Sequence, residues 1–558
     1  MRGKRALIAV LTALVLAGCG SLPTSGPVEP GVEAAPDEGV GYVVADDPHT
    51  GDTPSQIVRG FQSAAVAGIA DDFSTARKFL SQSAKGEWDP AAQVVIYDGA
   101  APLAYSKPDD ESVKVSATVV ATVDENGVYT AAAPGTTTTL SYELARNAAG
   151  EWRISELPDG VLMSEVNFGT LYRKTPLYFL TADADTLVPD VRWYPQRNSA
   201  TYAVRGLLAG ASEWLAPAVI SAVPTGTELS IDSVTVTGGT ATVPLTSAVQ
   251  TASAEDRALL VGQIEATLTA LPQVQSVQIT VGDVPLEVNA TIPPLEQDPG
   301  VGRTLTLLTA GDRLATFNGS EVVPNPDSVP LDPLDPSDPA VPLDSNLPEV
   351  MLAGDSRVVT APTTQSSSDT LVQGKQLLAP SYGPKGWIWT AEQNNTGQLV
   401  LARPDGQTKV LPAPSLDGVK LRALRVSRDG TRLALIAATD ESVEVSVHAI
   451  TIDDHGEPGG LGPALRVGRI LTDATDVVWV GESTLAVLGV SKTNETVHEV
   501  EVGGRTTALP SVEGTVDIAA GRGMRNVYLT TSDGRLFGRS GNGWAVVADG
   551  VHDPTFPG

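Results

Sequence analysis

The spacing of apolar residues divides the chain into regions with different predicted elements. Across residues 57–80 apolar residues recur at helical spacing, behind a helix start at Thr53-Pro54. Across residues 113–154 the spacing falls to two, which is typical of half-buried strands. Helices followed by a run of antiparallel strands predict an α+β domain over residues 51–165.

A second α+β domain is predicted over residues 170–295 from local signals. These signals are a helix that Asn198 or Ser199 caps and Gly210 ends, strands over 229–236 and 241–245 around the two-glycine turn Gly238-Gly239, a helix over 253–271 capped by Ser253, and an alternating strand over 277–281. Helices alternating with short strands again indicate the α+β class.

The remainder of the chain, residues 300–558, repeats a turn followed by a short apolar strand. The repeats lie at residues 311–315, 383–388, 429–434, 481–486 and 523–528. Their last residues are 73, 46, 52 and 42 positions apart, and three of these intervals lie near the roughly 40–50 residue period of β-propeller blades. Hairpin turns are expected at Asp405-Gly406, Asp417-Gly418, Asp429-Gly430 and Asp533-Gly534.

The long first interval contains an Asp/Pro-rich insertion at residues 324–348, predicted to be an exposed loop, and a possible extra strand at Arg357-Val358-Val359. The predicted fold class is therefore multidomain, with two α+β domains followed by an all-β propeller of five to six blades.

The N-terminus predicts a lipoprotein signal. A basic start is followed by twelve residues, 6–17, that are apolar except for Thr12, whereas a bilayer span needs about 20 residues. The stretch ends in Leu16-Ala17-Gly18-Cys19, the box at which bacterial lipoproteins are lipidated. We expect cleavage between Gly18 and Cys19, which removes residues 1–18. Cys19 would then carry S-diacylglycerol and N-palmitoyl groups, and residues 19–50 would form a flexible tether reaching roughly 30 Å from the membrane.

Composition narrows the possible functions. The net charge of −29 disfavours nucleic acid as a ligand, because the chain repels phosphate backbones. The single cysteine excludes an intrachain disulfide, and the five histidines form no cluster with metal-ligand spacing. The nearest approach to such a cluster, His448 and His455 with Asp453 and Asp454, is more typical of an exposed hairpin.

The sequence also lacks recognisable catalytic motifs. Ser540 lies in a Gly-Arg-Ser-Gly-Asn-Gly stretch in which Asn542 replaces the second glycine of a nucleophile elbow, so we interpret this stretch as a blade turn. Most carboxylates lie in turn-like segments, although counting alone leaves open a glycosidase pair of acids about 5–9 Å apart. Four tryptophans, Trp387, Trp389, Trp479 and Trp544, are predicted in blade cores. We expect a protein that is not an enzyme and has no cofactor or metal.

Two segments resemble known domains. The N-terminal helices and strands, which close with Trp152, resemble the nuclear-transport-factor-2-like domain of secreted lipoproteins. The segment from Pro224 to Leu229, the Gly238-Gly239 hairpin and the helix positions Gln263, Leu268, Leu271 and Pro272 resemble the GerMN domain, a binding module without an implied catalytic role. A lipidation box, these two domains and a propeller, in this order, resemble the LpqB family of actinobacterial envelope lipoproteins across essentially the whole chain.

The resemblance implies a lipid-anchored accessory protein on the extracytoplasmic face of the cell membrane. Family members are regarded as contacting the extracellular domain of the sensor kinase MtrB and influencing the MtrA–MtrB two-component system, and hence envelope homeostasis and cell division. Cys19 is the one family residue that carries over. Two alternatives stay open: a cell-wall glycan- or muropeptide-binding protein in envelope assembly, and an envelope hydrolase with a carboxylate pair.

Overall fold

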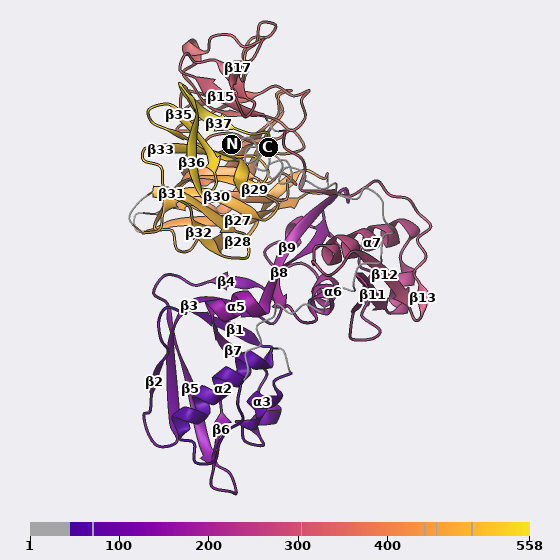
Figure 1. Ribbon diagram of the computed structural model, residues 1–558. Helices are drawn as coiled ribbons and strands as arrows, with labels where there is room; N and C mark the ends of the chain where they lie inside the picture. The colour runs from indigo at the N-terminus through magenta and orange to yellow at the C-terminus, as the bar shows by residue number, and fades with distance from the viewer. Residues whose placement is uncertain (1–44, 70–71, 303, 440–441, 454, 493–494) are drawn as a thin grey trace, which may run out of the picture. The chain divides into compact units, whose positions relative to one another are not determined.

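The computed structural model describes residues 45–558 except 70, 71, 303, 440, 441, 454, 493 and 494. Gly18, Cys19 and residues 19–44 of the predicted tether lie outside the described residues, so the predictions made for them remain predictions. The last part of the predicted tether, residues 45–50, is wrong as a flexible segment, because Ala45 packs against the core of the N-terminal region and Asp47 pairs with Lys78 at 2.7 Å. Residues Val43–Gly558 form one compact unit, in which three regions follow one another along the chain (Figure 1).

The N-terminal region packs short helices against a mainly antiparallel sheet. Thr53 begins the first helix as predicted, because its hydroxyl accepts the backbone N–H of Gln56 while the Gln56 side chain accepts the backbone N–H of Thr53. The helices are α2 (Pro54–Gly68), α3 (Ser74–Lys78), α4 (Ala84–Glu87) and α5 (Glu165–Leu171). The strands are β1 (Gln93–Tyr97), β2 (Ala104–Ser106), β3 (Ser112–Asp124), β4 (Tyr129–Ala131), β5 (Thr137–Arg146), β6 (Trp152–Glu156) and β7 (Val161–Ser164). Their order is β6-β5-β3-β1-β7, with β2 and β4 also paired to β3.

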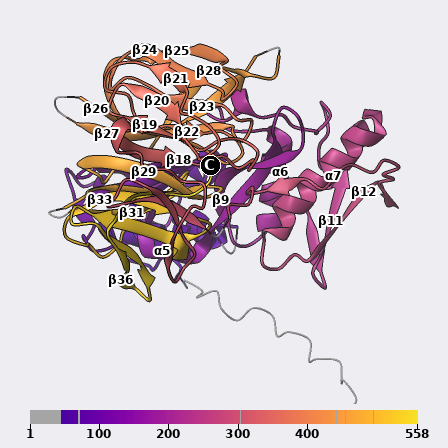
Figure 2. The same cartoon turned by 90° about the horizontal axis from the view of Figure 1, so that it is seen from above.

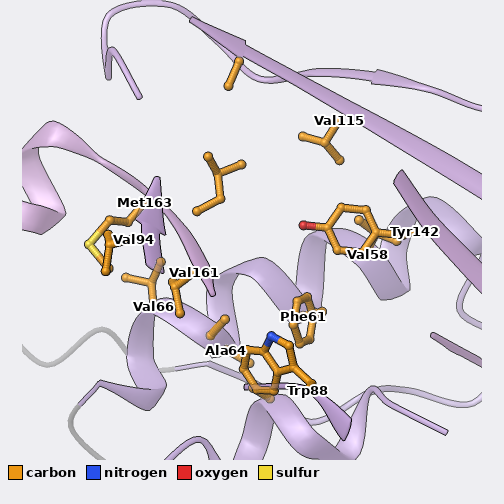
Figure 3. Packing of buried hydrophobic residues seen from close by; sticks show 14 of the residues in the cluster. Val58, Phe61, Ala64, Val66, Trp88, Val94, Val115, Tyr142, Val161 and Met163 are labelled. Carbon is orange, nitrogen blue, oxygen red and sulfur yellow. The ribbon is translucent and has the colours of Figure 1, made fainter. Parts of the chain in front are cut away.

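The core of this region lies between α2 and the sheet (Figure 3). The Phe61 ring lies 5.1 Å from the ring of Trp88 and 6.1 Å from the ring of Tyr142, both in edge-to-face geometry. Val58 on the helix and Val115 on β3 are fully buried. The apolar periods of 3.6 and two in the sequence therefore face each other across this core, as the α+β prediction requires.

The second region places two helices on one sheet. The elements are α6 (Ser199–Ala209), η1 (Ala216–Ala218), β10 (Thr235–Thr237), β11 (Thr240–Leu245), η2 (Ser247–Thr251), α7 (Ala254–Thr269), β12 (Ser276–Val281) and β13 (Val284–Pro285), with sheet order β10-β11-β12-β13. Asn198 and Gly210 bound α6, and the Ser253 hydroxyl accepts the N–H of Asp256 at the start of α7. The two helices pack on the sheet around one apolar core.

The strand predicted over 229–236 is wrong in its first half. The backbone turns tightly where the Ser233 N–H bonds to the carbonyl of Ile231, and Arg205 of α6 holds Asp232 at 2.8 Å. Ile231 is consequently 65% exposed, and only β10 of the predicted strand pairs across the Gly238-Gly239 turn.

A long hairpin that the sequence patterns did not predict precedes α6. It consists of β8 (Tyr172–Leu180) and β9 (Thr186–Pro195), and β14 (Glu296–Gln297) adds a short parallel strand to β9. Every residue of β9 except Pro195 is buried, so the burial does not alternate along the strand even where Asp190 and Arg192 alternate with apolar residues.

The third region consists of strands grouped as propeller blades. The strands are β15 (Leu305–Thr309), β16 (Leu314–Phe317), β17 (Val322–Pro324), β18 (Pro336–Ala340), β19 (Val350–Ala353), β20 (Arg357–Thr360), β21 (Thr370–Gln373), β22 (Ser381–Tyr382), β23 (Ile388–Thr390), β24 (Asn394–Ala402), β25 (Thr408–Val426), β26 (Arg432–Ala438), β27 (Val443–Ile452), β28 (Pro458–Val467), β29 (Asp473–Gly481), β30 (Thr484–Val490), β31 (Glu495–Glu501), β32 (Thr506–Ala508), β33 (Thr515–Ala520), β34 (Val527–Thr531), β35 (Arg535–Ser540), β36 (Gly543–Asp549) and β37 (Val551–Thr555). The C-terminal strand β37 pairs with β15 and completes the first four-stranded group.

These strands form six groups, because the seven-stranded sheet β22–β28 comprises two groups that share β25. Four of the five repeats found in the sequence lead into the second strand of a group, namely β23, β26, β30 and β34. The extra strand expected at Arg357-Val358-Val359 is β20. Within the described residues the strands thus form six blades, inside the predicted range of five to six.

Two details of the propeller prediction are wrong. The insertion 324–348 is not simply an exposed loop, since it contains η3 (Asp332–Leu334), the strand β18 and the buried side chains of Leu331 and Ala340. Asp417-Gly418 is not a turn but lies inside β25, where Asp417 is registered with Thr396. The other three Asp-Gly pairs do connect consecutive strands.

Candidate functional site

Strands from five blades surround a polar cavity of about 60 Å³ in the propeller. In the view of Figure 2 the C-terminus lies among β18, β22 and β29, and Gly558 is one of the residues that line the cavity. The charged side chains that line it from these strands are Asp338 of β18, Arg425 of β25, Asp476 of β29, Asp517 of β33 and Asp553 of β37.

Three of these side chains lie at irregularities in the pairing of their strands. The register shifts beside Asp338, Asp476 and Asp517 in β18, β29 and β33. Asp338 and Asp553 both have φ of +48° and both precede a proline. A β-bulge redirects a side chain. An edge strand tolerates proline, which has no backbone N–H, because an outward-facing position on the edge donates no hydrogen bond to a neighbouring strand. The sequence thereby directs carboxylates into the cavity instead of apolar residues.

The carboxylates perturb one another. Burial, together with repulsion from Asp553, raises the pKa of Asp338 to about 6. Burial and the neighbouring aspartates raise the pKa of Asp517 to about 7. Burial also raises the pKa of Asp476, against the attraction of Arg425, whose Nη2 lies 3.6 Å from Asp476 Oδ1. Burial thus raises the pKa values of three carboxyl groups that line this cavity.

The β8–β9 hairpin contacts both neighbouring regions. The Trp193 backbone N–H donates to the carbonyl of Gly127 in the N-terminal region at 2.8 Å, and its indole N–H donates to the carbonyl of Gly503 in the propeller at 2.9 Å. The Tyr178 hydroxyl donates to Glu482 at 2.6 Å, and Lys174 Nζ lies 2.5 Å from Glu501 Oε1. These bonds join three regions through one element.

Helix α7 holds the hairpin by a pair of buried polar side chains. Gln263 Nε2 donates to the backbone carbonyl of Tyr178 at 2.9 Å, and Thr267 Oγ1 accepts the Tyr178 N–H at 3.0 Å. Gln263 Oε1 also accepts the N–H of Ala222 at 2.7 Å. Both side chains are fully buried, so they satisfy backbone groups that would otherwise lack partners in the core.

Comparison with protein families covers nearly the whole described chain. The model of the LpqB lipoprotein N-terminal domain matches residues 47–169, a sporulation and spore germination domain matches 176–287, and the LpqB lipoprotein β-propeller domain matches 312–557. LpqB lipoproteins of Thermobifida fusca and Streptomyces coelicolor are 25% and 28% identical, over 98% and 99% of this chain and 97% of each relative. The chain belongs to the LpqB lipoprotein family.

Solved structures resemble parts of this LpqB-family chain. A TolB structure from Acinetobacter baumannii covers 45% of the chain and 65% of its own length at 15% identity, with a TM-score of 0.33. A nidogen/laminin complex covers 46% of the chain and 98% of its own length at 10% identity, with a TM-score of 0.31.

The two histidines considered as metal ligands in the sequence, His448 and His455, have different environments. His448 is buried in β27, where its ring nitrogens contact the Gly462 carbonyl and the Ser446 hydroxyl, and burial lowers its pKa. His455 is exposed, and its neighbour Asp453 pairs with Lys409 at 2.8 Å. Among the described residues no group of three or more His, Cys, Asp or Glu side chains is arranged to hold a metal ion.

Ser540 ends β35 and pairs with Gly543 across a hairpin, which confirms the blade-turn interpretation of this glycine-rich stretch. Trp387, Trp389 and Trp479 are buried in the propeller as predicted. Trp544 differs: it is only half-buried and its indole N–H donates to the Pro510 carbonyl at 2.7 Å. It lies on β36, the edge strand of its sheet, where no further strand covers it.

Sequence reasoning found neither the cavity aspartates nor the hairpin contacts. Asp338 and Asp553 each begin an Asp-Pro pair inside a short strand, but Asp-Pro also occurs at Asp89, Asp298 and Asp332, so the pair alone does not mark the cavity. None of the helices in the described part of the chain is long and apolar enough to cross a membrane.

Proposed function

We propose that this LpqB-family lipoprotein is a non-enzymatic accessory protein, anchored to the extracytoplasmic face of the cell membrane, that binds the extracellular domain of the sensor kinase MtrB and modulates MtrA–MtrB signalling. The observation that carries the proposal is the lipidation box ending at Cys19 on a chain that is similar to LpqB lipoproteins over nearly its full length. The Cys19 acyl chains would hold the protein at the membrane, since several chains together anchor firmly.

Confinement at the membrane supports binding to a membrane-bound kinase. Two proteins held at one surface meet at high effective concentration, so a modest interface is occupied. The propeller offers many loops on a rigid frame, and binding surfaces concentrate on such loops. The contact modulates the kinase if it favours one signalling state of the kinase over another. The net charge of −29 favours a basic surface on the partner.

The anchor is tested by replacing Cys19. The Cys19→Ala variant is expected to take up no labelled palmitate and to leave the membrane fraction, while the matched variant Ser21→Ala, two residues further on, stays labelled and membrane-bound. Labelling of Cys19→Ala at the level of Ser21→Ala contradicts the anchor.

The signalling role is tested in cells. Cells that carry only the Cys19→Ala form are expected to show altered phosphorylation of the response regulator at equal protein levels. Unchanged phosphorylation in cells without the protein, together with retention of the purified chain on cell-wall glycan, favours the wall-binding alternative instead.

A further inference from the structure

The segment between the second region and the propeller places a carboxylate between two arginines of the propeller. Asp298 follows directly after β14 and has φ of +47°, a left-handed conformation that aspartate adopts rarely. Its Oδ2 lies 2.9 Å from Arg522 Nε, and its Oδ1 lies 3.6 Å from Arg428 Nη1. Arg522 Nη2 also donates to the Asp298 backbone carbonyl.

Arg428 is held rigidly for this contact. Its side chain is 6% exposed, and Nη2 donates to the carbonyls of Trp479, Ala520 and Gly521 at 3.0, 3.3 and 3.0 Å. Nη1 is buried without a hydrogen-bond acceptor within the described residues, because 3.6 Å to Asp298 exceeds hydrogen-bond length. The guanidinium of Arg428 is thus fixed through Nη2, and its Nη1 remains available to donate a hydrogen bond.

A buried guanidinium needs an opposite charge nearby. Removing one partner of such a pair leaves an uncompensated buried charge, which is strongly unfavourable. Arg522 contacts the same Asp298 carboxylate, is 54% exposed, and adds a second positive charge that repels Arg428. A planar guanidinium pair recognises oxyanions, either carboxylate or phosphate, through paired N–H donors.

We propose that Arg428 and Arg522 form an oxyanion-binding site on the propeller, and that Asp298 occupies it as an internal ligand which an external carboxylate or phosphate group can replace. Strand β14 pairs with β9 and immediately precedes Asp298. When Asp298 occupies the site, residues 296–298 are therefore bound to the hairpin at one end and to the propeller at the other. An external oxyanion releases the segment. The site is independent of the proposed kinase contact.

The test uses inorganic phosphate as the probe and the full chain in detergent. Thermal unfolding is measured for the wild type, Asp298→Ala and the matched control Asp283→Ala, an exposed aspartate in the β12–β13 turn. Chloride and phosphate buffers have equal ionic strength. In chloride, Asp298→Ala is expected to melt below the control. Phosphate is expected to raise its Tm saturably by about 2–4 °C relative to the control.

The double variant Asp298→Ala/Arg522→Ala is expected to lose this phosphate effect. A phosphate effect of equal size in Asp283→Ala or in the double variant overturns the proposal. Asp298→Asn, which keeps the side-chain volume and removes the charge, serves if Asp298→Ala does not fold. Amide hydrogen exchange at β14 is expected to be faster in the Asp298 variant than in the control, and equal exchange overturns the fastening role.

Discussion

Gln263 offers the sharpest test of how α7 holds the β8–β9 hairpin. The Gln263→Leu substitution removes the donor to the Tyr178 carbonyl and the acceptor for the Ala222 N–H, at 2.9 and 2.7 Å. Each buried group left without a partner costs about 1–3 kcal/mol. The leucine recovers roughly 1–2 kcal/mol through its apolar surface. Two such groups cost about 2–6 kcal/mol, so the expected net loss in the free energy of unfolding is about 1–4 kcal/mol.

Urea unfolding followed by tryptophan fluorescence measures this loss, because Trp193 lies on the hairpin and Trp214 follows α6. Gln278→Leu is the matched control, since Gln278 is an exposed residue of β12 in the same domain. It is expected to change the free energy of unfolding by less than about 0.5 kcal/mol. A Gln263→Leu variant as stable as Gln278→Leu refutes the argument that Gln263 stabilises the fold by binding the hairpin at Tyr178 and the neighbouring segment at Ala222.

Two further predictions concern the propeller. The pKa of Asp517 is raised to about 7, above the roughly 3.9 of an unfolded aspartate, so its stabilising contribution is present below pH 4 and is lost as the pH rises through 7. The free energy of unfolding should thus fall from pH 5 to 8, less steeply in Asp517→Asn than in the exposed control Asp549→Asn, and equal slopes would contradict this. Asp429 accepts bonds from Ser427 and Thr431 and pairs with the buried Arg432, so Asp429→Asn is expected to cost about 3–5 kcal/mol in urea unfolding. Asp533→Asn, at the exposed Asp-Gly turn of another blade, should cost under about 1 kcal/mol, and similar losses would show that burial does not decide the cost.

The sequence correctly predicted helix starts and turns that depend only on residues close together in the chain. The helix start at Thr53-Pro54, the Ser253 cap and the Gly238-Gly239 turn each require only neighbouring residues, and each appears in the structure. The repeat in the last region predicted blades because each turn and strand pair is local. The order of the predicted domains pointed to the family.

Elements that depend on distant partners escaped prediction. Strand β9 is buried along nearly its whole length, and its polar residues Asp190 and Arg192 are buried as a pair at 2.7 Å, so they do not mark an exposed face. Strand β18 contains two prolines and an aspartate, a composition typical of loops, and only its position at a sheet edge beside a cavity makes it a strand. Asp338 and Asp553 meet across 215 residues, and no spacing rule connects them.

The central claim is that this chain binds the extracellular domain of the sensor kinase. The most direct measurement is the Kd between the full chain in nanodiscs and the isolated sensor domain, taken at low and high salt. Saturable binding that weakens as ionic strength rises is expected, because the chain carries a net charge of −29. Absence of saturable binding at low salt, with a sensor domain shown to be folded, would contradict it.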